Sequence, residues 1–327
     1  MNLIIPMGGR GTRLRPHTLT TPKPLIEIAG KSIVQRIVDL INKSKVQITN
    51  VGFIIEKPDL VIEEMLIKMG SENNISTSVF FQTKPEGTAH AIYCAKKMLK
   101  GPTMVVFADT LFETELKFPN DVDGCIFVKE VDDPSAYGVV KLNPNGVITD
   151  FIEKPKEPVS NLAIVGMYYF KDGALLKKEI KKILDKNTKV RGEYQITTAL
   201  EQLKEQKKTF LPIVIKSWYD CGSPTNILNS HAKILEKESP KSLTFKNTQI
   251  IPPCFIAKGV KISDSKIGPH VSIGKGTIIK SSVLKNTIIQ NKCIINGAVF
   301  SDSIIGNEVE YNKEYKSVSI GDYSTFK

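Results

Sequence analysis

The sequence predicts an α/β protein, with a mostly parallel sheet covered by helices followed by a short parallel β-helix. Two observations predict this class. Between about residues 2 and 219, short β-branched runs alternate with longer amphipathic segments, which is typical of parallel sheets. From residue 246 onward, apolar residues recur every five or six positions without a helical phase, which is typical of a β-helix.

The first part divides into strands and helices. Five short apolar runs predict its strands: Leu3–Ile5, Val51–Ile55, Ser78–Phe81, Met104–Phe107 and Gly124–Val128. Three longer amphipathic segments predict its helices: Ser32–Ser44, Pro58–Met69 and Thr88–Leu99. Ligands bind outside the carboxyl ends of parallel strands, so we expect the loops after these strands to carry the chemistry.

The repeat region has ten periodic apolar positions, which are Ile256, Ile262, Ile267, Ile273, Ile279, Leu284, Ile289, Ile295, Phe300 and Ile305. Hexapeptide-repeat arithmetic predicts roughly three coils of about 18 residues each. A β-sandwich with coincidental spacing is the alternative. We expect a first domain over residues 1–230, a linker over 231–245, the β-helix over 246–310 and a cap or tail over 311–327.

The composition argues against several classes of protein. The 327 residues are 41% hydrophobic and 24% charged, as in globular proteins, and the length suits two domains. No apolar run is long enough for a membrane-spanning helix. The net charge of +11 is spread without a basic block, so no nucleic-acid partner is expected. Five cysteines with no CxxC pair favour a reduced, cytoplasmic protein over a zinc or disulfide framework.

A glycine-rich loop, Pro6-Met7-Gly8-Gly9-Arg10-Gly11-Thr12-Arg13-Leu14, follows the first predicted strand. Glycines let backbone N–H groups approach an anion, and the arginines of the loop add phosphate ligands. Lys23 lies further on, with a proline on each side that stiffens the backbone. The loop is neither a Walker A loop nor a GxGxxG loop, because Arg13 and Leu14 occupy positions at which those motifs need other residues.

This loop, together with Pro22-Lys23-Pro24-Leu25, resembles the phosphate loop of the sugar-1-phosphate nucleotidyltransferases, also called nucleotide-sugar pyrophosphorylases. Further segments resemble that family in the family's order: Gln82 … Gly87-Thr88-Ala89-His90-Ala91, Val105–Asp109, Tyr137–Val140, Glu153-Lys154-Pro155, Ser160-Asn161 … Gly166-Met167-Tyr168, Arg191–Thr197 and Trp218–Gly222. The resemblance covers about residues 2–230. It implies a Rossmann-like fold, and some members also carry a hexapeptide-repeat, left-handed β-helix.

The resemblance implies a Mg²⁺-assisted, in-line attack of a sugar 1-phosphate on the α-phosphorus of a nucleoside triphosphate, which releases pyrophosphate. It implies four catalytic residues, namely Arg13 and Lys23 for the triphosphate and Asp109 and Asp220 for the metal. The implied nucleotide-binding residues are Gly8, Gly9, Gly11, Thr12, Arg13, Gln82 and Gly87. The implied sugar-phosphate-binding residues are Gly138, Glu153, Lys154, Asn161 and Arg191. Carboxylates suit Mg²⁺. Either aspartate taken alone would more often cap a turn, and it is the order of the family's segments that favours the metal role.

The substrates are only partly indicated. The segment Glu153–Ala163 looks most like the glucose-1-phosphate thymidylyltransferases, which implies dTTP and glucose 1-phosphate. UTP and GTP stay open, because Gly87-Thr88-Ala89-His90 occurs in uridylyl-, thymidylyl- and guanylyl-type enzymes. A catalytically silent nucleotide-sugar sensor is a further alternative, against which the intact Arg13, Lys23 and Asp109 argue.

Two departures from the family pattern bear on the site. Phe107-Ala108 precedes Asp109 where many members have Leu-Gly, and Thr198 replaces a usual aspartate. The four histidines show no metal-ligand spacing, and His90 is expected in the first turn of a helix under the nucleotide site. An acyltransferase acting through His270 is a weaker alternative. By resemblance, we expect the β-helix to serve in forming a homo-oligomer or in allostery.

Overall fold

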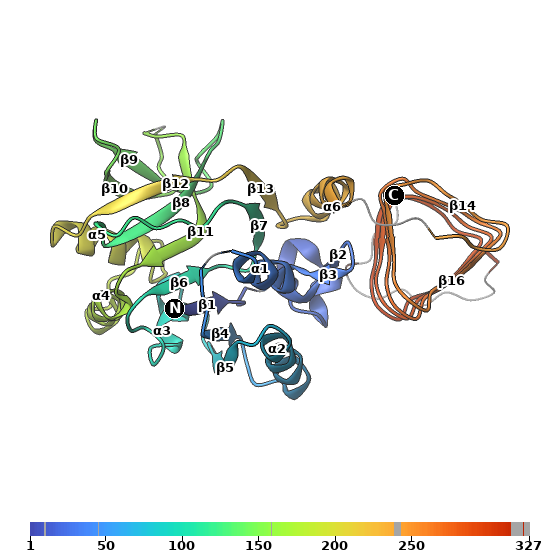
Figure 1. Cartoon of the computed structure of the whole chain (residues 1–327), viewed down its shortest axis with the longest axis horizontal. Coiled ribbons are helices and arrows are strands. Elements are labelled where there is room, and N and C mark those ends of the chain that lie inside the picture. The colour runs from blue at the N-terminus through green and yellow to red at the C-terminus, as the bar shows by residue number, and fades with distance from the viewer. Residues whose placement is uncertain (10, 45, 158, 239–242, 315–322, 324–327) are drawn as a thin grey trace. The chain divides into compact units, whose positions relative to one another are not determined.

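The computed structural model describes all residues except 10, 45, 158, 239–242, 315–322 and 324–327 (Figure 1). The chain forms two compact units. The first contains residues 1–9 and 37–218, and the second contains residues 10–36 and 219–327. No helix in the described part of the chain is long and apolar enough to cross a membrane.

The first unit contains one mixed sheet, in the order β10-β9-β11-β6-β1-β4-β5, with β8 and β12 attached through β11. Its strands are β1 (Asn2–Pro6), β4 (Asn50–Ile55), β5 (Ser76–Phe81), β6 (Thr103–Val106), β8 (Gly124–Glu130), β9 (Gly138–Leu142), β10 (Ile148–Glu153), β11 (Leu162–Phe170) and β12 (Phe210–Val214). Strands β6, β1, β4 and β5 are parallel, which confirms the predicted parallel sheet. Strand β11 runs antiparallel to β6, and it also pairs antiparallel with β8 and β9, so this side of the sheet is mixed.

The helices that contribute to the first unit are α1 (Ile33–Asn42), α2 (Leu60–Glu72), α3 (Thr88–Cys94), α4 (Gly173–Asp185) and α5 (Ile196–Glu205). Helix α2 begins where Asp59 accepts a hydrogen bond from the backbone of Ile62. Helix α3 is shorter than the predicted 88–99. After Cys94 the backbone bonds span only three residues, so the segment continues as turns that still bury Met98 and Leu99.

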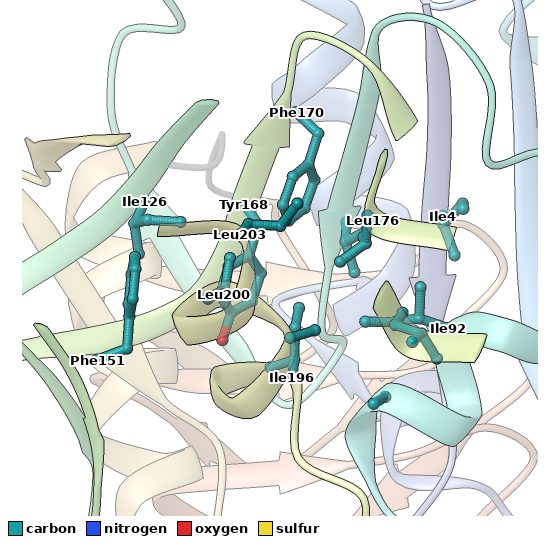
Figure 2. Close-up of a cluster of buried hydrophobic side chains, with 14 of the residues drawn as sticks. Ile4, Ile92, Ile126, Phe151, Tyr168, Phe170, Leu176, Ile196, Leu200 and Leu203 are labelled. Atoms are coloured by element: carbon teal, nitrogen blue, oxygen red, sulfur yellow. The ribbon is translucent and has the colours of Figure 1, made fainter. Parts of the chain in front are cut away.

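A buried apolar cluster joins the sheet of the first unit to α3, α4 and α5 (Figure 2). Helix α5 contributes Ile196, Leu200 and Leu203, whose spacing places them on one helical face. Tyr168 and Phe170 from β11 point into the same cluster. This core fixes β11 and the amino end of α5, and both of these elements carry residues of the candidate site.

The second unit begins with a loop of three short 3₁₀ turns, at Thr12–Leu14, His17–Leu19 and Lys23–Leu25, and a small hairpin of β2 (Glu27–Ile28) and β3 (Lys31–Ser32). Helix α6 (Pro224–Glu238) follows β13 (Ser217–Asp220), whereas β7 (Thr110–Glu113), which precedes β8, belongs to the first unit. Residues 231–238, which were expected to begin a linker, are therefore helical. Ile234 and Leu235 of this segment are buried, which favours a packed helix over an exposed linker.

The repeat region is a parallel β-helix (Figure 1). Its strands are β14 (Gln249–Ile250), β15 (Cys254–Ile256), β16 (Lys261–Ser263), β17 (Lys266–Ile267), β18 (Val271–Ile273), β19 (Ile278–Lys280), β20 (Val283–Ile289), β21 (Ile294–Asn296), β22 (Val299–Ile305) and β23 (Glu310–Asn312). Every pair among them is parallel, so the β-sandwich alternative is wrong. Most of the expected cap, residues 311–327, lies outside the described residues.

The coils are shorter than the 18 residues expected. Lys261 pairs with Ile278, and Ile278 pairs with Ile294, so successive coils take 17 and 16 residues. The cause is the spacing of the corners, where residues with positive φ recur every five or six positions: Asp264, His270, Gly276, Ser281, Asn286, Lys292, Gly297, Asp302 and Glu308. A side of five residues in place of six shortens each coil, and four strands rather than three stack in the column that starts at Lys261.

Candidate active site

Three predicted nucleotide-binding residues come together at the carboxyl edge of the parallel strands. Gly8 follows β1, and a Cβ atom built on it would lie 3.1 Å from Oε1 of Gln82, which follows β5. The Gln82 amide nitrogen donates to the backbone carbonyl of Gly87, at 3.1 Å. The glycine at position 8 therefore makes room for the amide. Gly9, beside it, has a φ of 121°, a conformation that glycine adopts readily.

Asp109 follows β6, the neighbour of β1 in the sheet. The departures before it are accommodated, because Phe107 packs edge-on against Tyr168 with ring centroids 6.2 Å apart, and Ala108 is buried. Burial raises the pKa of Tyr168, and the negative charges of Glu153 and Asp109 raise it further. The phenol of Tyr168 therefore lies close enough to Asp109, an implied metal ligand, and to Glu153, an implied sugar ligand, to interact with both charges.

Gly138 and Glu153, which the sequence predicts to bind the sugar, face each other on β9 and β10. A Cβ atom on Gly138 would lie 3.2 Å from Oε2 of Glu153. The same carboxylate oxygen accepts a hydrogen bond of 3.3 Å from the hydroxyl of Thr197, at the start of α5. Thr197 was not among the predicted site residues. It directly precedes Thr198, the position at which the family's usual aspartate is missing.

The remaining predicted sugar-phosphate residues of the first unit are exposed. Arg191 donates to the backbone carbonyl of Lys154, at 2.8 Å, so the two are brought together. Both have positive φ, 45° for Lys154 and 54° for Arg191. Asn161 accepts from the backbone of Val131 through its carbonyl, which leaves its side chain facing solvent.

The second unit contains the rest of the glycine loop. Gly11 is left-handed at φ 51°, and its carbonyl accepts a 2.7 Å hydrogen bond from the hydroxyl of Thr18. Thr12 and Arg13 then form a 3₁₀ turn that is anchored by the buried Leu14. Lys23 begins another 3₁₀ turn, in which its carbonyl accepts from the backbone of Ile26. The flanking prolines thus hold Lys23 on a defined turn, as the sequence predicts.

Asp220 also lies in the second unit, at the end of β13. Its Oδ1 accepts from the backbone of Gly222 at 2.6 Å, and its Oδ2 accepts from the amide of Asn226 at 2.5 Å. The carboxylate therefore caps the turn before α6. A Cβ atom on Gly222 would lie 3.3 Å from Nη2 of Arg13, so the guanidinium of Arg13 reaches this turn.

Asp109 in the first unit and Asp220 in the second each offer carboxylate oxygens, which are the ligands that a hard cation such as Mg²⁺ prefers. Among the described residues, no three or more His, Cys, Asp and Glu side chains cluster closely enough to hold a metal by themselves. Mg²⁺ is commonly bound by one or two carboxylates together with substrate phosphates and water. Each of the two carboxylates, taken within its own unit, has the chemistry for that mode of binding.

His90 and His270 each contact a residue of another element. His90 lies in the first turn of α3, as expected, with Nδ1 3.2 Å from the amide nitrogen of Gln82. No sequence motif marks that contact, because the two residues belong to different elements. His270 lies at a β-helix corner, where its Nε2 is 2.9 Å from Glu236 on α6. That contact gives His270 a structural role in joining α6 to the β-helix.

Comparison with known proteins gives consistent matches. A family described as nucleotidyl transferase matches residues 2–237. The chain is 31% identical to a bifunctional protein GlmU of Methanococcus aeolicus over 80% of its own length and 62% of that protein's length. It is 29% identical to a glucose-1-phosphate thymidylyltransferase of Streptomyces antibioticus, over 84% of this chain and 83% of the relative. It is 32% identical to a mannose-1-phosphate guanylyltransferase catalytic subunit beta of Drosophila pseudoobscura, over 79% and 71% respectively.

Proposed function

The chain belongs to the nucleotidyl transferase family of sugar-1-phosphate nucleotidyltransferases, and we propose that it makes a nucleoside diphosphate sugar from dTTP and glucose 1-phosphate. One observation carries the proposal: Gly8, Gln82 and Asp109 all follow parallel strands at the carboxyl edge of one sheet. Nucleotides bind at this edge in doubly wound α/β folds.

In the proposed reaction, an oxygen of the sugar 1-phosphate attacks the α-phosphorus of the triphosphate in line. The bond between the α-phosphorus and the oxygen that bridges to the β-phosphate breaks, and pyrophosphate leaves. Both reactants are anions, so catalysis depends on charge neutralisation and positioning. The proposed phosphate-binding residues are Gly8, Gly9, Gly11, Thr12, Arg13 and Lys23, of which the last two supply the positive charge.

We assign base recognition to Gln82 and Gly87, whose side chain and backbone already contact each other. Gly138, Glu153, Lys154, Asn161 and Arg191 are assigned to the sugar 1-phosphate. Support comes from the Glu153 carboxylate, which Thr197 orients toward Gly138. A carboxylate held in this way can accept hydrogen bonds from sugar hydroxyls.

We assign Asp109 and Asp220 to Mg²⁺, which when bound would supply Lewis-acid stabilisation of the phosphate oxygens. Each oxygen of Asp220 keeps a second lone pair beside the turn bond that it accepts, so a capping role and a metal role are compatible.

The relatives differ in base and sugar, so the proposed substrates need a direct test. Purified protein with Mg²⁺ and glucose 1-phosphate should release pyrophosphate with dTTP faster than with UTP or GTP, and mass spectrometry should find dTDP-glucose. A stronger preference for UTP or GTP would replace the thymidylyl assignment. No pyrophosphate with glucose, mannose, galactose or N-acetylglucosamine 1-phosphate would favour the alternative of a catalytically silent nucleotide-sugar sensor.

We further propose that the protein acts in the cytoplasm as a homo-oligomer assembled through its β-helix. The free state of its five cysteines supports a reducing compartment. Large apolar side chains that remain exposed on the β-helix, including Val299 at 77% exposure, support a contact between copies. Light scattering on the full chain should report a multiple of 36.3 kDa, and a monomer at micromolar concentration would overturn the proposal.

A further inference from the structure

The side-chain amide of Gln82 is held by two groups on its nitrogen side. Nε2 donates to the carbonyl of Gly87 at 3.1 Å and lies 3.2 Å from Nδ1 of His90. A carbonyl oxygen can only accept, so the NH₂ group and not the amide oxygen must face Gly87. Both N–H groups of the Gln82 amide are therefore used in contacts within the protein.

The same geometry defines the protonation of His90. Because an amide NH₂ only donates, Nδ1 of His90 must accept, and the ring proton lies on Nε2. Nε2 lies 3.8 Å from the carboxylate of Glu86, four residues earlier, and that carboxylate lies 3.5 Å from Lys189. The carboxylate favours a proton on the nitrogen facing it. In this series of contacts, the Gln82 amide donates to Nδ1 of His90, and the proton on Nε2 of His90 faces the carboxylate of Glu86.

The opposite end of the amide faces the nucleotide loop. Oε1 lies 3.1 Å from the position that a Cβ atom on Gly8 would occupy. No described residue donates a hydrogen bond to this oxygen, and it is not among the polar atoms sealed from solvent without a partner. Gln82 as a whole is only 7% exposed, so its oxygen is an acceptor presented within a confined space.

We infer that His90 is a positioning residue that fixes the amide orientation of Gln82, so that an acceptor oxygen faces the base. This inference rests on the proposed binding of a nucleoside triphosphate at this site. An acceptor at this place complements bases with a ring N–H on the pairing edge, which are uracil, thymine and guanine. It disfavours cytosine and adenine, because the ring nitrogen on their pairing edge carries no proton and would place a second acceptor against the amide oxygen.

The test is calorimetric binding of dTTP, UTP, GTP, CTP and ATP, each with Mg²⁺, to the wild type and to His90→Leu. The Leu side chain removes the acceptor and leaves the amide with one anchor. We expect affinity for the best-bound triphosphate to fall about two- to tenfold, the range for one lost hydrogen bond. Affinity for CTP and ATP should not fall, so the ratio of the affinity for the best-bound triphosphate to the affinity for CTP or ATP should decrease. His90→Asn can place an amide oxygen near the position of Nδ1 and should restore much of this ratio.

A double-mutant cycle separates positioning from a general structural effect. If His90 acts through Gln82, then His90→Leu should have little further effect on binding in a Gln82→Ala background. Lys97→Leu, a polar-to-leucine change at an exposed position just beyond the same helix, is the matched control and should change neither affinity nor discrimination.

Three results would overturn the inference: unchanged discrimination in His90→Leu, a loss of equal size for all five triphosphates, or a loss that persists fully in the Gln82→Ala background. The proposed function fails separately. A wild-type protein that binds triphosphates with the expected His90 dependence, but releases no pyrophosphate with any sugar 1-phosphate, would refute the reaction and keep the inference. A wild type that binds no triphosphate would refute both.

Discussion

The imidazole of His231 on α6 lies with Nε2 2.6 Å from the hydroxyl of Ser272 on β18, and both side chains are buried. The second ring nitrogen, Nδ1, is sealed from solvent with no hydrogen-bond partner in the described part of the chain. Burial, with smaller contributions from the positive charges of His270 and Arg36, lowers the pKa of His231 to about 3. The ring is therefore neutral at physiological pH.

This contact predicts a pH dependence of stability. Between pH 6.5 and about 3, the unfolded chain binds a proton at His231 and the folded chain does not, so stability falls as the pH falls. The slope approaches about 1.4 kcal/mol per pH unit for one proton. The melting temperature of the wild type should drop more between pH 7 and pH 5 than that of His231→Gln. The other histidines are present in both proteins, so parallel curves would contradict the prediction.

Gly30, in the turn of the β2–β3 hairpin, packs against Phe255 of the β-helix. A Cβ atom on Gly30 would lie 2.1 Å from the ring of Phe255, and its φ is 77°. Gly146 has nearly the same φ, 76°, but open space around it. Gly146→Ala should therefore cost only the backbone strain, about 1–2 kcal/mol. Gly30→Ala should cost a further 1–3 kcal/mol, roughly, for overpacking.

Denaturant unfolding of the two variants measures that difference. Because the added cost comes from the Phe255 ring, Gly30→Ala should be less damaging in a Phe255→Leu background than in the wild type. Equal losses for Gly30→Ala and Gly146→Ala would show that the ring moves aside without cost.

Thr197 orients the carboxylate of Glu153 through a hydrogen bond of 3.3 Å. Thr197→Val keeps the shape and removes the donor, so KM for the sugar 1-phosphate should rise about two- to tenfold, as for one lost hydrogen bond. KM for the nucleoside triphosphate should stay unchanged. Thr198→Val, at the next position, is the matched control. Equal effects of the two variants on both substrates would indicate general damage to α5 instead.

The repeat region shows what the sequence could and could not predict. Buried columns such as Ile262, Ile279 and Ile295 keep their periodicity whatever the corners do, so the parallel β-helix was predicted correctly. The coil length was not, because it depends on whether each corner takes one residue more or less. Residues that prefer positive φ, such as Asp264 and Asn286, mark those corners only weakly.

The candidate site shows the same division. Gly8, Gln82 and Asp109 were predictable because each lies within three residues of the end of a strand, and strand ends can be identified from β-branched runs. The contacts of His90 with Gln82 and of Thr197 with Glu153 join residues from different elements. Such contacts depend on how helices pack on the sheet, which a periodic pattern does not specify. The sequence therefore placed His90 in the correct helical turn but did not predict its contact with Gln82, and it did not identify Thr197 as a partner of Glu153.

The two implied metal ligands should respond differently to the same change. Asp109→Asn removes a negative charge at the end of β6, and we expect turnover to fall about a hundredfold or more, as for loss of a preorganised electrostatic group. Asp220→Asn should lower turnover too, but it should also lower the melting temperature. Its new amide NH₂ would face either the Gly222 N–H or the Asn226 amide nitrogen, both of which now donate to the carboxylate.

Steady-state kinetics at saturating substrates, together with thermal unfolding, separate these two effects. Asp185→Asn is the control, because that carboxylate forms an exposed ion pair with Lys181 on α4. Exposed pairs contribute little to stability, so Asp185→Asn should leave both turnover and melting temperature near wild type. Near wild-type turnover in Asp109→Asn would remove this residue from the metal site. A lower melting temperature with full turnover in Asp220→Asn would leave Asp220 as a turn cap alone.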